Sequence, residues 1–179
     1  MNLSLVSVRY AKALFKLSVE KGVMEEVYKD IQLLSGHYKD NDSFRMFMQS
    51  PVVKAEKKKA FLKEVYENAV NPITLGAVNL IIDNNREGIL DAVFRSFSSF
   101  YKKDKNIKTA TLYSAFDMDK EFQNEIKMIV AKELNCEVEL SVVVKTDLLG
   151  GFILKVDDKM VDASIIGKLQ RVRKHLVKG

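Results

Sequence analysis

The spacing of apolar residues changes character at one point of this chain, the charged stretch Lys102–Asn106. Before that stretch, apolar residues recur at the three- and four-residue intervals of helices. After it, segments such as Glu137–Val144 alternate apolar and polar residues, which is the period of a strand. A single domain of one class does not explain both periods. The sequence therefore predicts two domains, residues 1–105 and residues 106–179, with an α+β fold overall.

The first predicted domain is a bundle of six helices. Turn and capping residues divide it into segments of helical length, and 47% hydrophobic residues provide enough apolar surface for a core. The dividing signals are Gly22, Asn41-Asp42-Ser43, Ser50-Pro51, Asn71-Pro72 and Asp83–Gly88.

The helix expected over residues 1–22 has two apolar sides. Its apolar arc covers roughly two thirds of the circumference, whereas a surface helix needs an arc of only about 100°. Two interpretations stay open: the helix is central in its own bundle, or one side receives a helix of a partner. One side carries Val8, Ala11, Phe15 and Val19, and the neighbouring side carries Tyr10, Ala13, Leu14 and Leu17.

The segment that follows Pro72 has almost no polar face. Proline is well placed at the first position of a helix, and a helix that is apolar all round is buried by its own domain or with help from a partner. Its apolar residues are Ile73, Leu75, Ala77, Val78, Leu80, Ile81 and Ile82.

The second predicted domain is a small α/β sandwich with the order β-α-β-β-(β)-α. A strand over Ile107–Ala115 is followed by a helix that Asp117 can cap, then by the strand Glu137–Val144. A glycine turn at Gly150-Gly151 precedes a strand, a polar break at Asp157–Lys159 and a short return strand. Asp162 or Ser164 can cap the last helix, expected over Ser164–Val177.

The residues that usually perform chemistry are scattered. His37 and His175 have no cysteine or carboxylate at metal-ligand spacing, and Cys136 has no second cysteine to pair with. Asp157, Asp158 and Asp162 do not have the spacing of a calcium loop, and the glycine pair precedes a strand rather than the helix of a phosphate loop. The sequence predicts no catalytic residue, no metal site and no cofactor.

The net charge of +5 permits an anionic partner without requiring one. A nucleic-acid-binding adaptor is therefore an alternative function, although no aromatic residues interleave with the lysines and no RNA-recognition motif is present. A small enzyme is a weaker alternative. The start of the chain has no secretory signal and no apolar run is long enough for a membrane span, so a bacterial cytoplasmic location is expected. The basic residues cluster as Lys54, Lys57, Lys58 and Lys59, expected on a solvated face, and as Arg171, Arg173, Lys174 and Lys178.

Two motifs carry a family resemblance. The run Arg9–Phe15 (RYAKALF) and the C-terminal block of Leu149–Phe152 (LGGF), Val156–Asp158 (VDD), Asp162–Ser164 (DAS) and Leu169 resemble the delta subunit of F-type ATP synthases. The mitochondrial member of that family is the oligomycin-sensitivity-conferring subunit. Ala163 stands where the family more often has glycine.

The resemblance implies a non-catalytic stator subunit that links the F1 head to the b-subunit peripheral stalk and resists rotor torque during proton-driven ATP synthesis. It implies a peripheral location at the cytoplasmic face of the bacterial inner membrane, with membrane association only through the complex. The helical domain would take the N-terminal helix of an alpha subunit between its first and fifth helices, Leu3–Lys21 and Pro72–Asn84, and the second domain would bind the C-terminal helices of b. The expected alpha-contacting residues are Tyr10, Ala13, Leu14, Leu17, Leu75, Val78 and Ile82, and the structural signature is Gly150, Gly151, Asp162 and Ser164.

Overall fold

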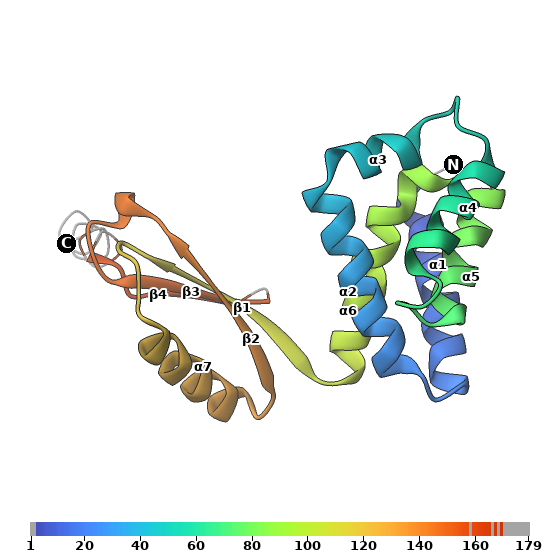
Figure 1. The fold of residues 1–179 in the computed structure, drawn as a ribbon. Coiled ribbons are helices and arrows are strands. Elements are labelled where there is room, and N and C mark those ends of the chain that lie inside the picture. The colour runs from blue at the N-terminus through green and yellow to red at the C-terminus, as the bar shows by residue number, and fades with distance from the viewer. Residues whose placement is uncertain (1–2, 158, 166, 168, 170–179) are drawn as a thin grey trace. The chain divides into compact units, whose positions relative to one another are not determined.

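The computed structural model of this chain describes residues 3–157, 159–165, 167 and 169 (Figure 1). The chain divides into two compact units, Met1–Lys102 and Lys103–Gly179. The first is helical, and the second is built on a four-stranded sheet. This confirms the predicted fold class.

The helical unit contains the six predicted α-helices and one short 3-10 helix, η1, that the sequence did not indicate. Asn41 and Asn71 begin two of these helices, since each side chain accepts a hydrogen bond from a backbone N–H of the first turn. The elements are α1 (Leu3–Glu20), α2 (Met24–Asp40), α3 (Asp42–Gln49), α4 (Ala55–Tyr66), α5 (Pro72–Asp83), η1 (Glu87–Ile89) and α6 (Leu90–Asp104).

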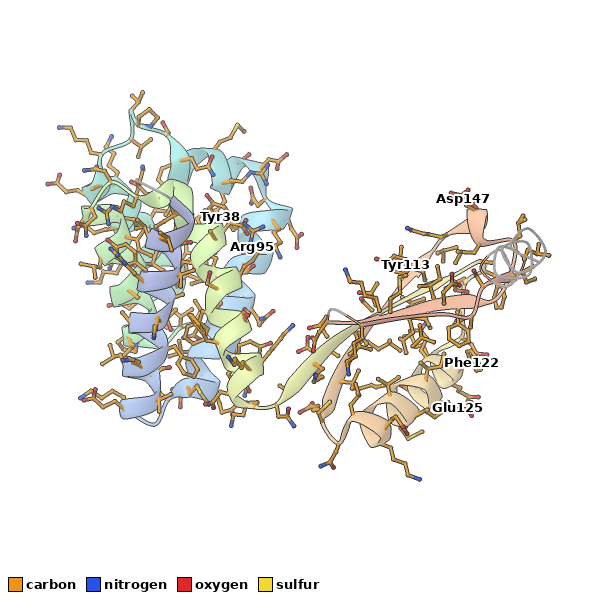
Figure 2. All side chains as sticks on the ribbon, turned by 180° about the vertical axis from the view of Figure 1, so that it is seen from behind. Tyr38, Arg95, Tyr113, Phe122, Glu125 and Asp147 are labelled. Carbon is orange, nitrogen blue, oxygen red and sulfur yellow. The ribbon has the colours of Figure 1, made fainter. Side chains whose placement is uncertain are left out.

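The core of this unit lies where α1, α2, α5 and α6 meet. Phe97 of α6 is fully buried, and its ring lies 6.0 Å from that of Phe15. Tyr38, labelled in Figure 2, packs edge-on against Phe44 and Phe94. Other fully buried side chains are Ile31, Met48, Leu62, Ile81, Ile82 and Leu90.

One lysine of the cluster at the start of α4 lies inside the helical unit. The Lys58 ammonium is 2.7 Å from a carboxylate oxygen of Glu87, and both side chains are almost completely buried. Lys59 forms a more exposed ion pair with Asp83 at 2.6 Å. The prediction of a solvated lysine face was therefore wrong for Lys58, because η1 brings a carboxylate to it across 29 residues of sequence.

The second unit has a mixed sheet in the order β2-β1-β3-β4. β1 pairs in parallel with β2, with Ile107 opposite Glu137, and antiparallel with β3, which pairs antiparallel with β4. The crossover helix α7 covers one face (Figure 1), where Ala110, Val130 and Val138 form a small buried cluster. The elements are β1 (Ile107–Ser114), α7 (Lys120–Leu134), β2 (Glu137–Val144), η2 (Thr146–Leu148), β3 (Phe152–Val156) and β4 (Lys159–Asp162).

Two details of the second unit differ from the prediction or lie beyond it. Asp119, not Asp117, caps α7: its side chain accepts a hydrogen bond from the Phe122 N–H at 2.7 Å. Met118 is buried just before this cap, so the helix begins only after that side chain has reached the core. The predicted last helix, Ser164–Val177, falls largely outside the described residues, as do His175 and the basic cluster of residues 171–178.

Candidate functional site

The titratable side chains of the described residues do not form a metal site. No group of three or more His, Cys, Asp or Glu side chains among them could hold a metal ion. His37 Nδ1 lies 2.7 Å from the Tyr66 hydroxyl, and Cys136 packs beside the small cluster of the sheet unit.

An apolar groove of about 300 Å³ lies between α1 and α5. A groove with apolar walls on two helices suits the apolar face of a third helix. Its walls consist of Tyr10, Ala13, Leu14 and Leu17 from α1, Ile73, Gly76, Ala77, Val78, Leu80 and Ile81 from α5, and Ile31, Val93 and Phe94 at the base.

Ala11 and Ala13 of α1 have different environments, although Val8 and Val19 on the Ala11 side also remain 38% and 50% exposed. Ala11 is fully buried in the helical unit, whereas Ala13 is exposed and lines the groove. Leu14 is buried at the base of the groove, and Leu17 retains 40% of its surface exposed. All four α1 residues expected from the sequence, Tyr10, Ala13, Leu14 and Leu17, thus lie on one surface.

The groove face of α5 is only partly the one expected. Val78 lines the groove, but Ile82 is fully buried outside it, so Ile82 is a core residue. Leu75 is also outside the lining, because it lies seven residues before Ile82 and therefore on the same side of α5.

Sequence reasoning missed five residues of the α5 wall, of which Ile81 is buried at the groove. The other four repeat at i, i+3, i+4 and i+7, the spacing of one helical face, but α5 is apolar on its other sides too, so the pattern alone did not single out this face. These four residues are Ile73, Gly76, Ala77 and Leu80.

A polar contact fixes one edge of the groove. Arg86 donates a hydrogen bond to the Tyr10 hydroxyl at 3.1 Å, and its guanidinium lies 5.8 Å from the centre of the Tyr10 ring. Arg86 lies three residues beyond the end of α5, so the end of α5 lies beside the first half of α1. Asn71, which precedes α5, donates to Glu26 near the start of α2 at 2.8 Å. Because α2 begins just after α1 ends, α1 and α5 run antiparallel.

The sheet unit has a second apolar groove, of about 480 Å³, between α7 and the β3–β4 hairpin. Ile129 and Val161 on its walls are mostly exposed, at 67% and 60%. At its edge the Lys108 ammonium is 3.0 Å from a carboxylate oxygen of Asp157, and this hydrogen bond raises the pKa of Lys108. This unit also presents an apolar surface large enough for a partner segment.

The glycine turn of the sheet unit is held by its own backbone. Gly151 has a φ of +76°, and a Cβ there would lie 2.5 Å from the carbonyl oxygen of Ala163. Gly150 also has a positive φ, and a Cβ there would lie 2.7 Å from the Ile165 side chain. Both glycines therefore allow the start of β3 to pass close to the chain that follows β4.

Asp162, the last residue of β4, and Ser164 are joined by hydrogen bonds. The Ser164 hydroxyl accepts a hydrogen bond from the Gly167 N–H at 3.0 Å, which is the bond of an N-cap. Asp162 accepts from both the backbone N–H and the hydroxyl of Ser164, at 2.9 and 2.6 Å. Ser164 is therefore the capping residue and Asp162 orients it.

No helix in the described part of the chain combines the length and the apolar character needed to cross a bilayer.

Comparisons with known proteins agree over almost the whole chain. The profile of the family described as ATP synthase delta (OSCP) subunit matches residues 6–176. The chain is 33% identical over 168 residues to the ATP synthase subunit delta of Christiangramia forsetii, covering 94% of this chain and 91% of that one. It is 31% identical over 179 residues to the subunit of the same name from Bacillus thuringiensis, with 99% of each chain covered.

Among solved structures, a chain of the Toxoplasma gondii mitochondrial ATP synthase hexamer, determined by cryo-electron microscopy, is similar with a TM-score of 0.79. The two chains are 23% identical, and the match covers 96% of this chain and 97% of that chain. The similarity extends through both units and shows a shared fold.

Proposed function

Since this chain belongs to the ATP synthase delta (OSCP) family and is a subunit of the ATP synthase complex, we propose that it is the stator component that links the F1 head to the peripheral stalk. In this role it resists the torque of the rotor during proton-driven ATP synthesis. It binds no nucleotide and performs no chemistry of its own.

The observation that supports this role is the groove between α1 and α5. Leu17 and Leu80 are exposed at 40% and 55% on its two walls, although both are large apolar residues. Apolar surface of this kind gains free energy when a partner removes it from water, by about 25 cal/mol per Å². We assign the groove to the amphipathic N-terminal helix of an alpha subunit.

Charges beside the groove suit the encounter with such a helix. Arg9, Lys12 and Lys16 are exposed on the outer strip of α1. Acidic residues that flank the apolar stripe of the partner helix would be attracted to this strip, which raises the association rate more than it raises affinity.

The sheet unit is assigned to the other side of the linkage. Its groove between α7 and the β3–β4 hairpin would receive the C-terminal helices of the b subunits. The subunit would then be peripheral at the cytoplasmic face of a bacterial inner membrane and attached to the membrane only through the complex.

The lysine cluster at the start of α4 gives the nucleic-acid-binding alternative little support. Lys58 and Lys59 are engaged with Glu87 and Asp83, so two of the four clustered lysines already have carboxylate partners. A phosphate backbone would have to compete with those partners.

The test is a calorimetric titration of the full-length protein with a synthetic peptide of the alpha-subunit N-terminus from the same organism. We expect saturation at one peptide per chain and a negative heat-capacity change, because apolar surface is buried. Absence of binding by a folded sample would contradict the assignment of the groove.

A further inference from the structure

Gly76 lies in the interior of α5 and lines the α1–α5 groove. It is exposed, and a Cβ built on its helical backbone would meet no protein atom within 4 Å. Glycine in a helix interior is less favourable than alanine, because the unfolded chain gains more conformational freedom from glycine. Nothing within the described part of the chain therefore explains why this position lacks a side chain.

The groove wall around Gly76 is low, which suggests that a partner occupies the space. Ala77, the next residue of α5, also lines the groove, so the α5 wall is lowest at Gly76 and Ala77. Leu80, one turn further along α5, is 55% exposed, and Leu17 on the α1 wall is 40% exposed. The α5 wall thus has a small-residue opening, and large exposed leucines stand on both walls of the groove.

We propose that Gly76 is a specificity-determining residue, which leaves this opening free for one large apolar side chain of the partner helix. The inference rests on the proposed function, since it takes the alpha-subunit helix as the occupant. A methyl group at residue 76 would project into the opening and hold the partner helix away from both leucines. Close packing at an interface leaves no room for an added methyl group, so a small change has a large effect.

Gly36 is a matched control. It lies in the interior of α2, a Cβ there would also meet no protein atom within 4 Å, and it does not line the groove. Gly36→Ala and Gly76→Ala therefore make the same chemical change in the same kind of backbone, and only one of them faces the proposed partner.

The experiment measures melting temperature and peptide affinity for the wild type, Gly36→Ala, Gly76→Ala and Gly76→Leu. Both alanine variants should melt a few degrees higher than the wild type, because alanine restricts the unfolded chain. Gly36→Ala should bind the alpha N-terminal peptide with unchanged affinity. Gly76→Ala should bind about tenfold more weakly, and Gly76→Leu about a hundredfold more weakly.

A set of peptides locates the side chain that enters the opening. Each large apolar residue of the alpha peptide is replaced in turn by alanine and titrated against the wild type and Gly76→Ala. One replacement should weaken binding to the wild type strongly but have little further effect on Gly76→Ala, which is the coupling that a direct contact produces.

Different results identify which idea has failed. If the wild type binds the peptide and Gly76→Ala binds equally well, the specificity role is wrong while the groove assignment stands. Equal weakening by Gly36→Ala and Gly76→Ala would also overturn it, since the effect would then come from helix stiffness. If the folded wild type does not bind the peptide, the proposed function itself fails.

Discussion

Gly151 of the sheet unit has surroundings that exclude a side chain, whereas Gly76 of the helical unit does not. At Gly151 a Cβ would lie 2.5 Å from the Ala163 carbonyl oxygen and 2.9 Å from the Ser164 Cα, so the fold itself excludes a side chain. At Gly76 a Cβ would meet no atom within 4 Å other than its neighbouring helix backbone. The first glycine is explained from within the chain, whereas the second is not.

The contrast shows how to separate residues that build this protein from residues that serve a partner. The most recognisable sequence block, around Gly150-Gly151 and Asp162–Ser164, has internal hydrogen bonds and close backbone contacts that account for each residue. The groove residues Ala13 and Gly76 have no such account. The glycine and aspartate residues of the recognisable C-terminal block are therefore needed for folding. The small groove residues, which folding does not require, are the better candidates for contact with a partner.

The largest expected effect is a difference in folding stability between aspartate substitutions at Ala11 and at Ala13 of α1. Ala11→Asp would place an unpaired charge at a fully buried position, and we expect the helical unit to lose more than about 5 kcal/mol and unfold. Ala13→Asp lies at an exposed position and should leave the unit folded. Circular dichroism and thermal melting of the two variants measure this difference.

The same pair also tests the groove. Ala13→Asp should weaken binding of the alpha peptide by about a hundredfold, since a carboxylate would be desolvated against an apolar helix face. If Ala13→Asp unfolds as Ala11→Asp does, both sides of α1 are core and the groove is not a binding surface.

A second comparison concerns one ion pair in each unit. Lys58→Met should cost about 3–5 kcal/mol, because the Glu87 carboxylate would stay buried without its partner at 2.7 Å. Replacing Glu87 by leucine in the same chain should recover most of that loss.

Lys108→Met in the sheet unit should change stability little, because the Lys108–Asp157 pair is exposed. Urea unfolding curves check all three variants, and equal losses for Lys58→Met and Lys108→Met would contradict the difference in burial.

Replacement of glycine by alanine should change stability in opposite directions in the two units. Gly151→Ala should destabilise the sheet unit by about 2–3 kcal/mol, because the alanine must adopt a positive φ against the Ala163 carbonyl. Gly36→Ala should stabilise the helical unit by about 0.5–1 kcal/mol. Amide hydrogen exchange read by mass spectrometry assigns each change to its unit. Unchanged protection of β3 and β4 in Gly151→Ala would show that the turn can relax.

The sequence predicted the elements well, because hydrophobic period and capping chemistry are local properties. Six helices, the order of the sheet unit and the turn at Gly150-Gly151 follow from residues close together in the chain. The cap of α7 was misplaced by two residues because Asp117 and Asp119 are both good caps, and burial of Met118 decides between them.

The site was harder to predict than the fold. α1 has two apolar sides and α5 is apolar almost all round, so periodicity alone could not say which side of either helix faced the core. Ile82 and Leu80 are equally apolar in sequence, yet one is fully buried and the other is 55% exposed. Packing of Ile81, Ile82 and Val78 against the rest of the bundle distinguishes the core side of α5, and the sequence does not record which neighbours they meet.

The smallest expected effect is a loss of stability of the helical unit at alkaline pH. Tyr38 and Tyr66 are 3% and 4% exposed, and burial raises the pKa of both above the ordinary value of 10.0. In the unfolded chain these phenols ionise near that ordinary value, so the unfolded state binds fewer protons once the pH exceeds it. The contribution of the two neutral phenols is therefore fully present below pH 10.0 and declines as the pH rises through the raised pKa values.

Urea titrations followed by helical circular dichroism at about pH 8 and above pH 10.0 measure this decline. Tyr38→Phe should flatten the alkaline slope while it loses the hydrogen bond that Gln49 donates at 2.8 Å, so its stability is lower at neutral pH but falls less on raising the pH. The sheet unit provides the internal comparison, since neither of these two phenols belongs to it. If Tyr38→Phe and the wild type lose stability in parallel above pH 10.0, the alkaline sensitivity has another origin and burial of these phenols does not control it.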